Sequence, residues 1–394
     1  MTQLSKNKQL VINIAASFVA LAVHMAINFV LSPYIVATIG AEANGFVSFA
    51  TQILGYITIL TISLNSMTNR FISIAWYRGE NEKASQYFTS AFYANLFCVA
   101  IIAVPIFWTI ANLEKVLNVS TELVFDVKTL FVFMSISFFM TLIFSTFSVV
   151  YYIKNSLYIN SVISITDSVI QALLLWLLFA NYEPLVCYRG IVALIIGIMA
   201  ASFHIYFKNR LTPELVIRKA YYDFNKIKEL VKAGIWNSIT RLGEVLSNGL
   251  DLLITNLFID GNTMGVLAIA KLFPTVVTQI LSAMVSSFVP NLTKLYALGE
   301  QQKLVHEIKF SMKIGAFFTN ILMAGILAFG LNLFRLWIPS QNVKLIYYAT
   351  VVTIIGSVVG SSINTLFNVF TVTNKLKLNS IVTFIQGFMN VLIV

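Results

Sequence analysis

The sequence predicts an all-α, polytopic membrane protein built from two similar bundles of helices. Its 394 residues are 58% hydrophobic and only 11% charged, whereas soluble domains carry about 25% charged residues. The mean hydropathy is +0.84, and long apolar runs recur along the whole chain. The net charge of +10 does not indicate a nucleic-acid partner, because the basic residues cluster in the loops between the apolar runs.

Eleven apolar runs account for the predicted membrane spans, since each is long enough to cross about 30 Å of hydrocarbon as a helix. The first run is too long for the core of a signal peptide, so we predict that it is a span. The last run is still apolar at Val394, so we expect either that the final helix is truncated or that its terminus is atypical. The predicted spans are residues 10–36, 46–66, 88–111, 125–151, 158–180, 185–207, 234–259, 264–290, 312–334, 343–371 and 377–394.

The basic residues predict the orientation of these spans. With a cytoplasmic N-terminus, nineteen of the 26 Lys and Arg residues fall in inner segments and five in outer segments. Positive charge favours the cytoplasmic side, so we predict a multi-pass protein of the cytoplasmic membrane with its N-terminus inside the cell. Arg241 and Lys271 are the two basic residues that lie inside predicted spans.

The longest polar interval, residues 208–233, divides the chain. It carries seven Lys and Arg residues and predicts a cytoplasmic linker with a short amphipathic helix near residues 222–232. The predicted domains are therefore an N-terminal transmembrane bundle at residues 1–207 and an incomplete C-terminal bundle at residues 234–394.

The two halves share a weak internal repeat. A shift of 220 residues aligns Gly45 with Gly265 and Glu80 with Glu300, and it keeps the same offset through the second span and the loop that follows. Six spans separate the copies, so both copies have the same orientation, and parallel repeats predict two bundles related by an axis along the membrane normal. The other aligned pairs are Ala50 with Ala270, Gly79 with Gly299, Lys83 with Lys303 and, after a one-residue gap, Gly40 with Gly261.

One predicted span carries an ionisable stripe. Between residues 234 and 259 the polar residues recur at steps of four and three, which places them on one face of a helix. A charge at the centre of a membrane costs about 2.5–3.5 kcal/mol on an insertion scale, so we expect the stripe to face protein or water. The stripe consists of Asn237, Arg241, Glu244, Asn248, Asp251 and Thr255.

Several pairings are open to the charges in the spans. Arg241 and Glu244 are three residues apart and could form an ion pair on one helix. Asp251 and Lys271 are predicted at the same depth of consecutive spans, where they could neutralise each other or bracket an anionic ligand. Asp167 in the fifth span is near the depth of Arg241 and could face it. We predict that this group lines a polar cavity.

The first span also has polar residues at helical spacing, namely Asn13, Ser17, His24 and Asn28. His24 and Asn28 either line the same cavity or, for His24, form a hydrogen bond to another helix. The sequence contains no arrangement typical of a nucleophile with its base, of a phosphate-binding loop or of a metal site. We therefore predict a protein without catalytic residues, metal or cofactor.

Four features together resemble one family. They are the repeat of six-span units, the stretch G-A-E-A-N-G-F at residues 40–46, the loop R-G-E-N-E-K at residues 78–83 and the basic central linker. The chain resembles a Wzx-type polysaccharide flippase of the multidrug/oligosaccharidyl-lipid/polysaccharide (MOP) exporter superfamily. The resemblance implies two bundles around a central cavity, alternating access, and a lipid-linked oligosaccharide as cargo for surface polysaccharide biosynthesis.

An undecaprenyl-pyrophosphate glycan would need such a cavity, because its charged and hydroxylated head is very costly to move through hydrocarbon. Arg241 and Lys271 would bind the pyrophosphate, and polar side chains would contact the sugars. Asp167, Glu244 and Asp251 would balance charge or bind a coupling proton or sodium ion. Membrane lipids and a polysaccharide polymerase are the other expected partners.

Three other functions are compatible with a polytopic membrane protein. A cation-coupled multidrug exporter of the same superfamily is the nearest alternative, but such exporters often carry a carboxylate in the first span, and residues 10–36 have none. A membrane polymerase generally needs a sizeable outer loop, whereas the longest predicted here is residues 112–124. The third alternative is a scaffold or channel. The three acidic and two basic residues within spans argue against a purely structural role.

Overall fold

The computed structural model describes residues 6–154, 156–248, 250–286, 288, 292, 295–296, 300–372 and 376–393. Helices are the only regular elements in these residues, and this agrees with the predicted all-α fold. The chain divides into two compact units. Unit 1 comprises Met1–Ile39 and Ala50–Arg241, and unit 2 comprises Gly40–Phe49 and Leu242–Val394.

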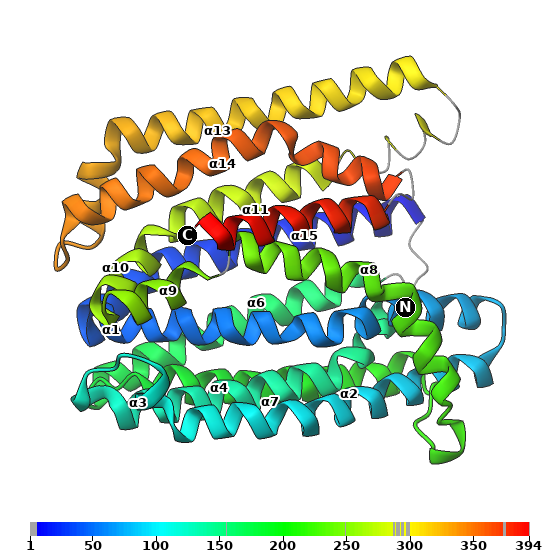
Figure 1. Ribbon diagram of the computed structural model, residues 1–394. Helices are drawn as coiled ribbons and strands as arrows, with labels where there is room; N and C mark the ends of the chain where they lie inside the picture. The colour runs from blue at the N-terminus through cyan, green and yellow to red at the C-terminus, as the bar shows by residue number, and fades with distance from the viewer. Residues whose placement is uncertain are drawn as a thin grey trace. The chain divides into compact units, whose positions relative to one another are not determined.

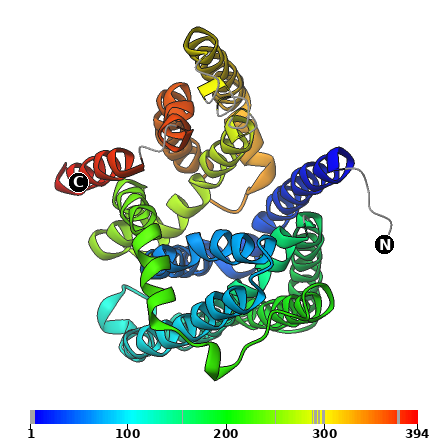
Figure 2. The ribbon, with the colours of Figure 1, turned by 90° about the vertical axis from the view of Figure 1, so that its right-hand side faces the viewer.

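Unit 1 contains most of the first seven helices and the start of α8. Its long helices run side by side in Figures 1 and 2, and its largest apolar core packs Phe88, Tyr151 and Leu230 together. The elements that contribute to this unit are α1 (Lys6–Tyr77), α2 (Asn81–Ala111), α3 (Leu113–Val116), η1 (Thr121–Leu123), α4 (Val124–Phe144), η2 (Ser145–Ser148), α5 (Val149–Ile153), α6 (Leu157–Asn181), α7 (Cys187–Leu211), η3 (Lys219–Tyr221) and α8 (Phe224–Asn248).

Unit 2 contains the remaining helices and a short part of α1. One of its apolar clusters packs Val277, Ile326 and Ile354 against Phe273. Its elements after α8 are α9 (Asp251–Phe258), α10 (Gly261–Ala270), α11 (Leu272–Ser286), α13 (Gln301–Trp337), α14 (Val343–Val372) and α15 (Leu376–Ile393).

Helix α1 holds the first two predicted spans. It has 72 residues and is interrupted at Gly40, where φ is +85°. Glycine adopts this conformation readily because it has no side chain, whereas other residues are strained there. The sequence of residues 40–46 therefore begins with a residue that allows the chain to leave one helix and start the next.

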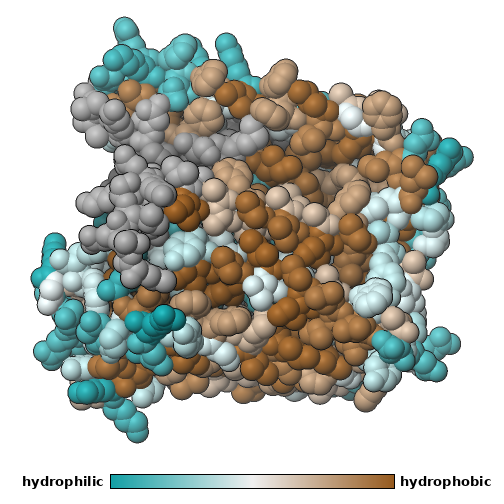
Figure 3. Space-filling model, turned by 180° about the vertical axis from the view of Figure 1, so that it is seen from behind, coloured by the Kyte–Doolittle hydropathy of each residue, from teal (hydrophilic) through white to brown (hydrophobic). Residues whose placement is uncertain are grey.

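Side chains exposed along the helices are strongly apolar. Val30, Phe97 and Val352 are 71%, 67% and 71% exposed, and Figure 3 shows apolar side chains over the middle of the visible face with hydrophilic ones towards its ends. Seven helices in the described part of the chain are long and apolar enough to cross a membrane, and the first of them runs from Ala15 to Tyr77. The protein is therefore a polytopic membrane protein.

The repeat is visible where α2 and α13 begin. Glu80 and Glu300 precede these helices with nearly the same backbone angles, φ/ψ of −82°/61° and −79°/67°. Each donates its backbone N–H to the residue five positions earlier, at 3.0 and 3.1 Å. Each also pairs with the lysine three residues later, Lys83 at 3.0 Å and Lys303 at 2.8 Å. Two segments 220 residues apart thus adopt one local structure.

Matched glycines of the repeat meet inside unit 2. A Cβ atom on Gly45 would lie 2.7 Å from the Cα atom of Gly265, and one on Gly265 would lie 2.1 Å from the carbonyl oxygen of Ala41. Neither helix has room for a side chain here. Small residues allow helix backbones to approach closely and gain van der Waals contact, which is a frequent basis of helix packing in membranes.

Candidate functional site

Lys271 and Asp251 form an ion pair inside unit 2. The ammonium nitrogen of Lys271 lies 2.6 Å from a carboxylate oxygen of Asp251, and the two side chains are 20% and 47% exposed. Mutual neutralisation lowers the cost of placing either charge at membrane depth. Because the carboxylate is about half exposed, the pair is accessible at the surface of its unit.

Both members of the pair stand at helix ends. Asp251 is the first residue of α9, and Lys271 directly follows the last residue of α10. The helix macrodipole favours a negative group at the N-terminus and a positive group at the C-terminus, so each charge is stabilised where it stands. Interrupted helices are common at the binding sites of transporters, because their ends present charges and unpaired backbone groups at membrane depth.

Pro274 explains the interruption at Lys271. Proline has no N–H, so the carbonyl of Ala270, four residues earlier, loses its helical donor. The hydroxyl of Thr350 in α14 lies 3.1 Å from that carbonyl oxygen and 2.8 Å from the carbonyl oxygen of Ile346 on its own helix. Thr350 is fully buried, and its single hydroxyl hydrogen is shared between these two carbonyls. Helix α14 thus supplies part of the missing donation at the point where Lys271 leaves the helix.

The end of α8, which precedes Asp251, is held by α15. The side-chain amide of Asn390 donates to the carbonyls of Leu246 and Ser247 at 3.3 and 3.0 Å. These carbonyls belong to the last turn of a helix, where C=O groups have no N–H donor within the helix. The two helices are in close contact at Gly387. A Cβ atom added there would lie 2.4 Å from the carbonyl oxygen of Gly243.

The predicted stripe is divided between two helices. The expectation of one helix over residues 234–259 was wrong, because α8 begins at Phe224 and ends at Asn248 before α9 begins at Asp251. Asp251 and Arg241 therefore belong to different helices. The side chain of Arg241 is half-buried, Glu244 is exposed, and the side chain of Asn248 lies outside the described set.

The predicted amphipathic helix of the linker also differs from expectation. It does not end before the span but continues into it as α8. Asn237 on this helix donates to the hydroxyl of Ser66 at 3.0 Å, and the hydroxyl of Ser238 donates to the carbonyl of Ile59 at 3.0 Å. Helix α1 thus provides hydrogen-bond acceptors for two polar side chains of α8 within unit 1.

The polar residues of the first span line a seam between α1 and α6 in unit 1. His24 is one of them, and its hydrogen bond to another helix fits one of the two predicted alternatives. Asn28 lies one turn later, where its amide approaches the second ring nitrogen of His24 at 3.0 Å and donates to the His24 carbonyl at 2.9 Å. The contacts of the seam are Asn13 Oδ1 with the Tyr158 N–H at 3.0 Å, Ser17 Oγ with Ser161 Oγ at 3.3 Å, and His24 Nδ1 with Ser168 Oγ at 3.3 Å.

Asp167 lies next to this seam, on α6. One carboxylate oxygen, Oδ1, is buried and accepts no hydrogen bond from the residues that the structure describes. A buried carboxylate oxygen without a partner is costly, and ionisable groups in such surroundings are frequent at functional sites. Asp167 is therefore the acidic residue in unit 1 that stays a candidate for binding a coupling ion.

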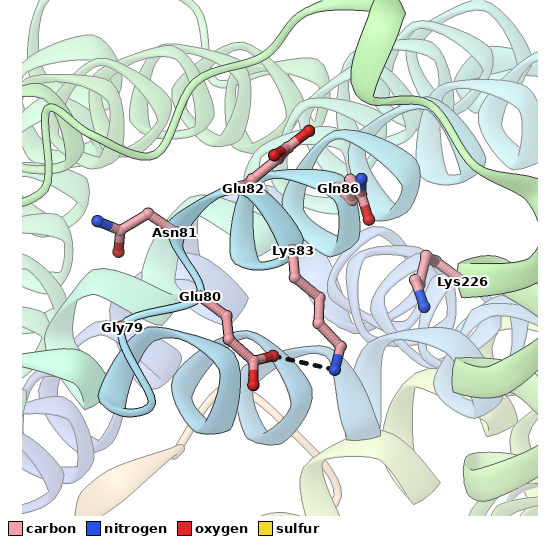
Figure 4. A pocket seen from close by; sticks show the side chains of 7 residues that line it. All are labelled: Gly79, Glu80, Asn81, Glu82, Lys83, Gln86 and Lys226. Carbon is pink, nitrogen blue, oxygen red and sulfur yellow. Dashed lines mark ion pairs between the residues drawn. The ribbon is translucent and has the colours of Figure 1, made fainter.

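The loop at residues 78–83 forms one wall of a shallow pocket in unit 1. The pocket has a volume of about 590 Å³, and Figure 4 shows Glu80 and Lys83 facing each other with Lys226 of α8 nearby. The Lys83 ammonium donates a hydrogen bond to Glu80 and lowers the pKa of its carboxyl group. The remaining lining residues are Gly79, Asn81, Glu82 and Gln86.

Several residues of these sites were not predicted from the sequence. Thr350 and Asn390 bond to carbonyls of other helices, and Ser66 and Ser168 bond to predicted polar residues. Pro274 in the eighth predicted span was the one available signal for a helix interruption beside Lys271.

Residues 10–296 match the family described as polysaccharide biosynthesis protein. The chain is 27% identical to the membrane protein EpsK of Bacillus subtilis strain 168 over 387 residues, which are 97% of this chain and 75% of EpsK.

Solved structures of MOP superfamily transporters are similar at the level of fold. The MATE multidrug transporter DinF-BH has a TM-score of 0.71 at 15% identity, and the match covers 96% of this chain and 86% of that transporter. An inward-facing MATE family transporter has a TM-score of 0.70 at 13% identity, covering 95% and 86%. A MOP superfamily transporter from Pyrococcus furiosus has a TM-score of 0.64 at 14% identity, covering 96% and 95%.

The chain is a multi-pass membrane protein, and its fold is similar to that of MOP superfamily transporters. The chain belongs to the polysaccharide biosynthesis protein family.

Proposed function

We propose that the protein flips a lipid-linked oligosaccharide repeat unit across the cytoplasmic membrane by alternating access, with no covalent change to its cargo. The observation that carries the proposal is the ion pair of Lys271 and Asp251, formed where two helices are interrupted. Membership of a polysaccharide biosynthesis family favours a glycan cargo, and a lipid carrier is the form in which a glycan repeat unit is held at a membrane.

The ion pair suits a pyrophosphate head group. Lys271 is a donor already placed at membrane depth, and Asp251 neutralises it while the site is empty. A pyrophosphate carries more charge than one carboxylate and offers more acceptors, so it would replace Asp251 as the partner of Lys271 through charge-assisted hydrogen bonds. The released carboxylate is 47% exposed, so water can solvate it.

The remaining predicted site residues have supporting roles in this proposal. Arg241 is the second phosphate ligand, because its guanidinium group forms paired hydrogen bonds to phosphate. Asn28, Asn237 and Asn248 contact sugar hydroxyls, and Glu244 balances charge. Asp167 and His24 are the groups that take up a coupling proton or a sodium ion. The N-terminus is cytoplasmic, and the released glycan passes to polysaccharide polymerase machinery.

The test uses a strain that lacks the gene and makes no surface polysaccharide. Lys271→Gln should abolish complementation, while Asp251→Asn should retain part of it, because only the lysine is needed to bind phosphate. Both proteins should be present in the membrane at normal levels. Lys303→Gln is the matched control, because its exposed pair with Glu300 stands outside the predicted spans, and it should complement fully.

The double variant Lys271→Gln/Asp251→Asn distinguishes a structural role of the ion pair from a phosphate-binding role of Lys271. It removes both charges of the pair together, so a purely structural role predicts normal polysaccharide. That result would contradict the proposed phosphate role. Loss of polysaccharide with a normally folded protein supports it. Accumulation of lipid-linked repeat units on the inner leaflet would complete the evidence for flipping.

Multidrug export is the second candidate, because the similar folds include multidrug transporters. It predicts that expression in a pump-deficient host protects against several unrelated cationic drugs. The absence of acidic residues from residues 10–36 and the lysine at the interrupted helix both disfavour a cationic cargo.

A further inference from the structure

The linker between the two predicted bundles is fixed to unit 1 along one of its faces. Three hydroxyl groups in the first turns of α2 bind its backbone: Ser85 Oγ to the carbonyl of Glu214 at 3.4 Å, Thr89 Oγ1 to the carbonyl of Val216 at 3.1 Å, and Ser90 Oγ to the N–H of Asp223 at 2.9 Å. The linker thus follows a defined path over α2.

Side chains strengthen the same attachment. Leu215 and Leu230 are fully buried in the core of unit 1. The hydroxyl of Tyr87 donates to the carboxylate of Glu229, and Lys226 lies 3.2 Å from the same residue. Hydrogen bonds from Tyr87 and Lys226 lower the pKa of the Glu229 carboxyl group. Glu229 is therefore already engaged by unit 1.

The linker also presents a basic, exposed surface. None of its five exposed cations forms an ion pair with a carboxylate of the residues that the structure describes. Of the acidic residues in the same stretch, Glu229 is engaged as above, Asp223 accepts the N–H of Asn225 at 2.8 Å, and Glu214 is exposed. The exposed cations are Arg210, Arg218, Lys219, Lys228 and Lys232.

Exposed aromatic side chains stand among these cations. Tyr206, Tyr222 and Phe224 are 52%, 48% and 57% exposed, and the ammonium group of Lys228 lies 5.0 Å from the ring centre of Phe224. Figures 1 and 2 show the first part of α8 running across the end of the unit 1 helices instead of along them. Aromatic rings at the level of basic residues are typical of the membrane–water boundary.

We propose that this basic face, defined as Arg210, Arg218, Lys219, Lys228 and Lys232, binds the anionic phospholipid surface of the leaflet that it faces. A solvated loop would need neither a fixed path nor exposed rings among its cations. The attachment to α2 holds the cations in place before lipid binds, so little ordering is lost on binding. Juxtamembrane Lys and Arg residues attract anionic lipid additively, and the exposed rings can insert at head-group level.

The experiment measures which lipid surrounds the linker of the full chain. Tyr222→Cys is labelled with a fluorophore in a Cys98→Ala/Cys187→Ala background, and the protein is reconstituted in nanodiscs of phosphatidylcholine with phosphatidylglycerol. A spin label is carried on either lipid. We expect labelled phosphatidylglycerol to quench more strongly than labelled phosphatidylcholine. The triple variant Arg218→Gln/Lys219→Gln/Lys228→Gln should lower the relative association constant at least tenfold.

Two controls separate charge at this face from charge in general. The triple variant Lys115→Gln/Arg335→Gln/Lys344→Gln removes three exposed cations from segments predicted on the other side of the membrane, and it should leave the preference unchanged. The charge-preserving variant Arg218→Lys/Lys219→Arg/Lys228→Arg should retain the preference. This variant also shows that the linker tolerates substitution at all three positions.

Three results would each overturn the proposal. The first is equal quenching by the two lipids in the parent protein. The second is a preference that survives the triple Gln variant. The third is a preference removed by millimolar pyrophosphate but not by sodium chloride of equal ionic strength, which would indicate a discrete phosphate site in place of a membrane-binding surface. None of these outcomes depends on the cargo, so the test stands independently of the proposed function.

Discussion

The contact between Gly265 and Ala41 gives a sharp test of how unit 2 is packed. In Gly265→Ala the new methyl carbon would lie 2.1 Å from the carbonyl oxygen and 2.5 Å from the carbonyl carbon of Ala41. Both atoms belong to the backbone, so no side chain can rotate away, and the segment that follows Gly40 must move away from α10.

The size of the effect follows from two opposing terms. Replacing Gly by Ala inside a helix stabilises it by about 1 kcal/mol, and overpacking a close contact costs about 1–3 kcal/mol. Because the atoms met are backbone, the cost should lie at the upper end of that range. We expect Gly265→Ala to lower the free energy of unfolding by about 2 kcal/mol.

The assay is reversible unfolding by SDS in mixed micelles, with Gly325→Ala as the matched control. Gly325 lies inside α13 of the same unit, and a Cβ atom there would meet nothing within 4 Å. The control should therefore be stabilised by about 0.5–1 kcal/mol, which separates the two variants by about 3 kcal/mol. Equal stability of the two variants would refute the close approach of these helices.

Two further predictions concern the helix ends of unit 2. Thr350→Val removes the hydroxyl that bonds Ala270, leaves a buried carbonyl without a donor, and should destabilise the protein by about 1–3 kcal/mol in the same assay. Asp260 caps α10, accepting the Thr263 N–H at 2.7 Å and its hydroxyl at 2.8 Å, so Asp260→Ala should cost about 1 kcal/mol at pH 7. The Thr263 hydrogen bonds lower the pKa of Asp260, so its contribution is present above the unfolded-state pKa of about 3.9 and is lost as the pH falls through the lower folded-state value.

Each of these predictions has its own control. Thr353→Val removes a hydroxyl whose one hydrogen bond within the described residues is to the Ala349 carbonyl of its own helix, at 2.7 Å. It should cost much less than Thr350→Val. For Asp260, the stability difference between the parent and the Ala variant should shrink as the pH is lowered from 5 towards 3. A difference that stays constant over that interval would show that the carboxylate charge does not hold the cap.

Local features of the chain could be predicted from its sequence. Membrane spans depend on apolar runs, and the orientation preference depends on loop charge, so both can be read without knowing which helices touch. The turns at Glu80 and Glu300 repeat because the same residues recur 220 positions apart, and their ion pairs form between residues only three positions apart. Such contacts are set by the geometry of a single helix end.

Contacts between helices were decided by the tertiary structure. Helical periodicity placed Asp251 and Arg241 on one stripe, but α8 ends before Asp251, and its last turn bonds to Asn390, more than 140 residues away in the chain. The interruption at Lys271 depends equally on Pro274, which the sequence reveals, and on Thr350, which only packing brings to Ala270. A backbone group freed inside a membrane must find a partner, and no local pattern in the sequence says which distant side chain will provide it.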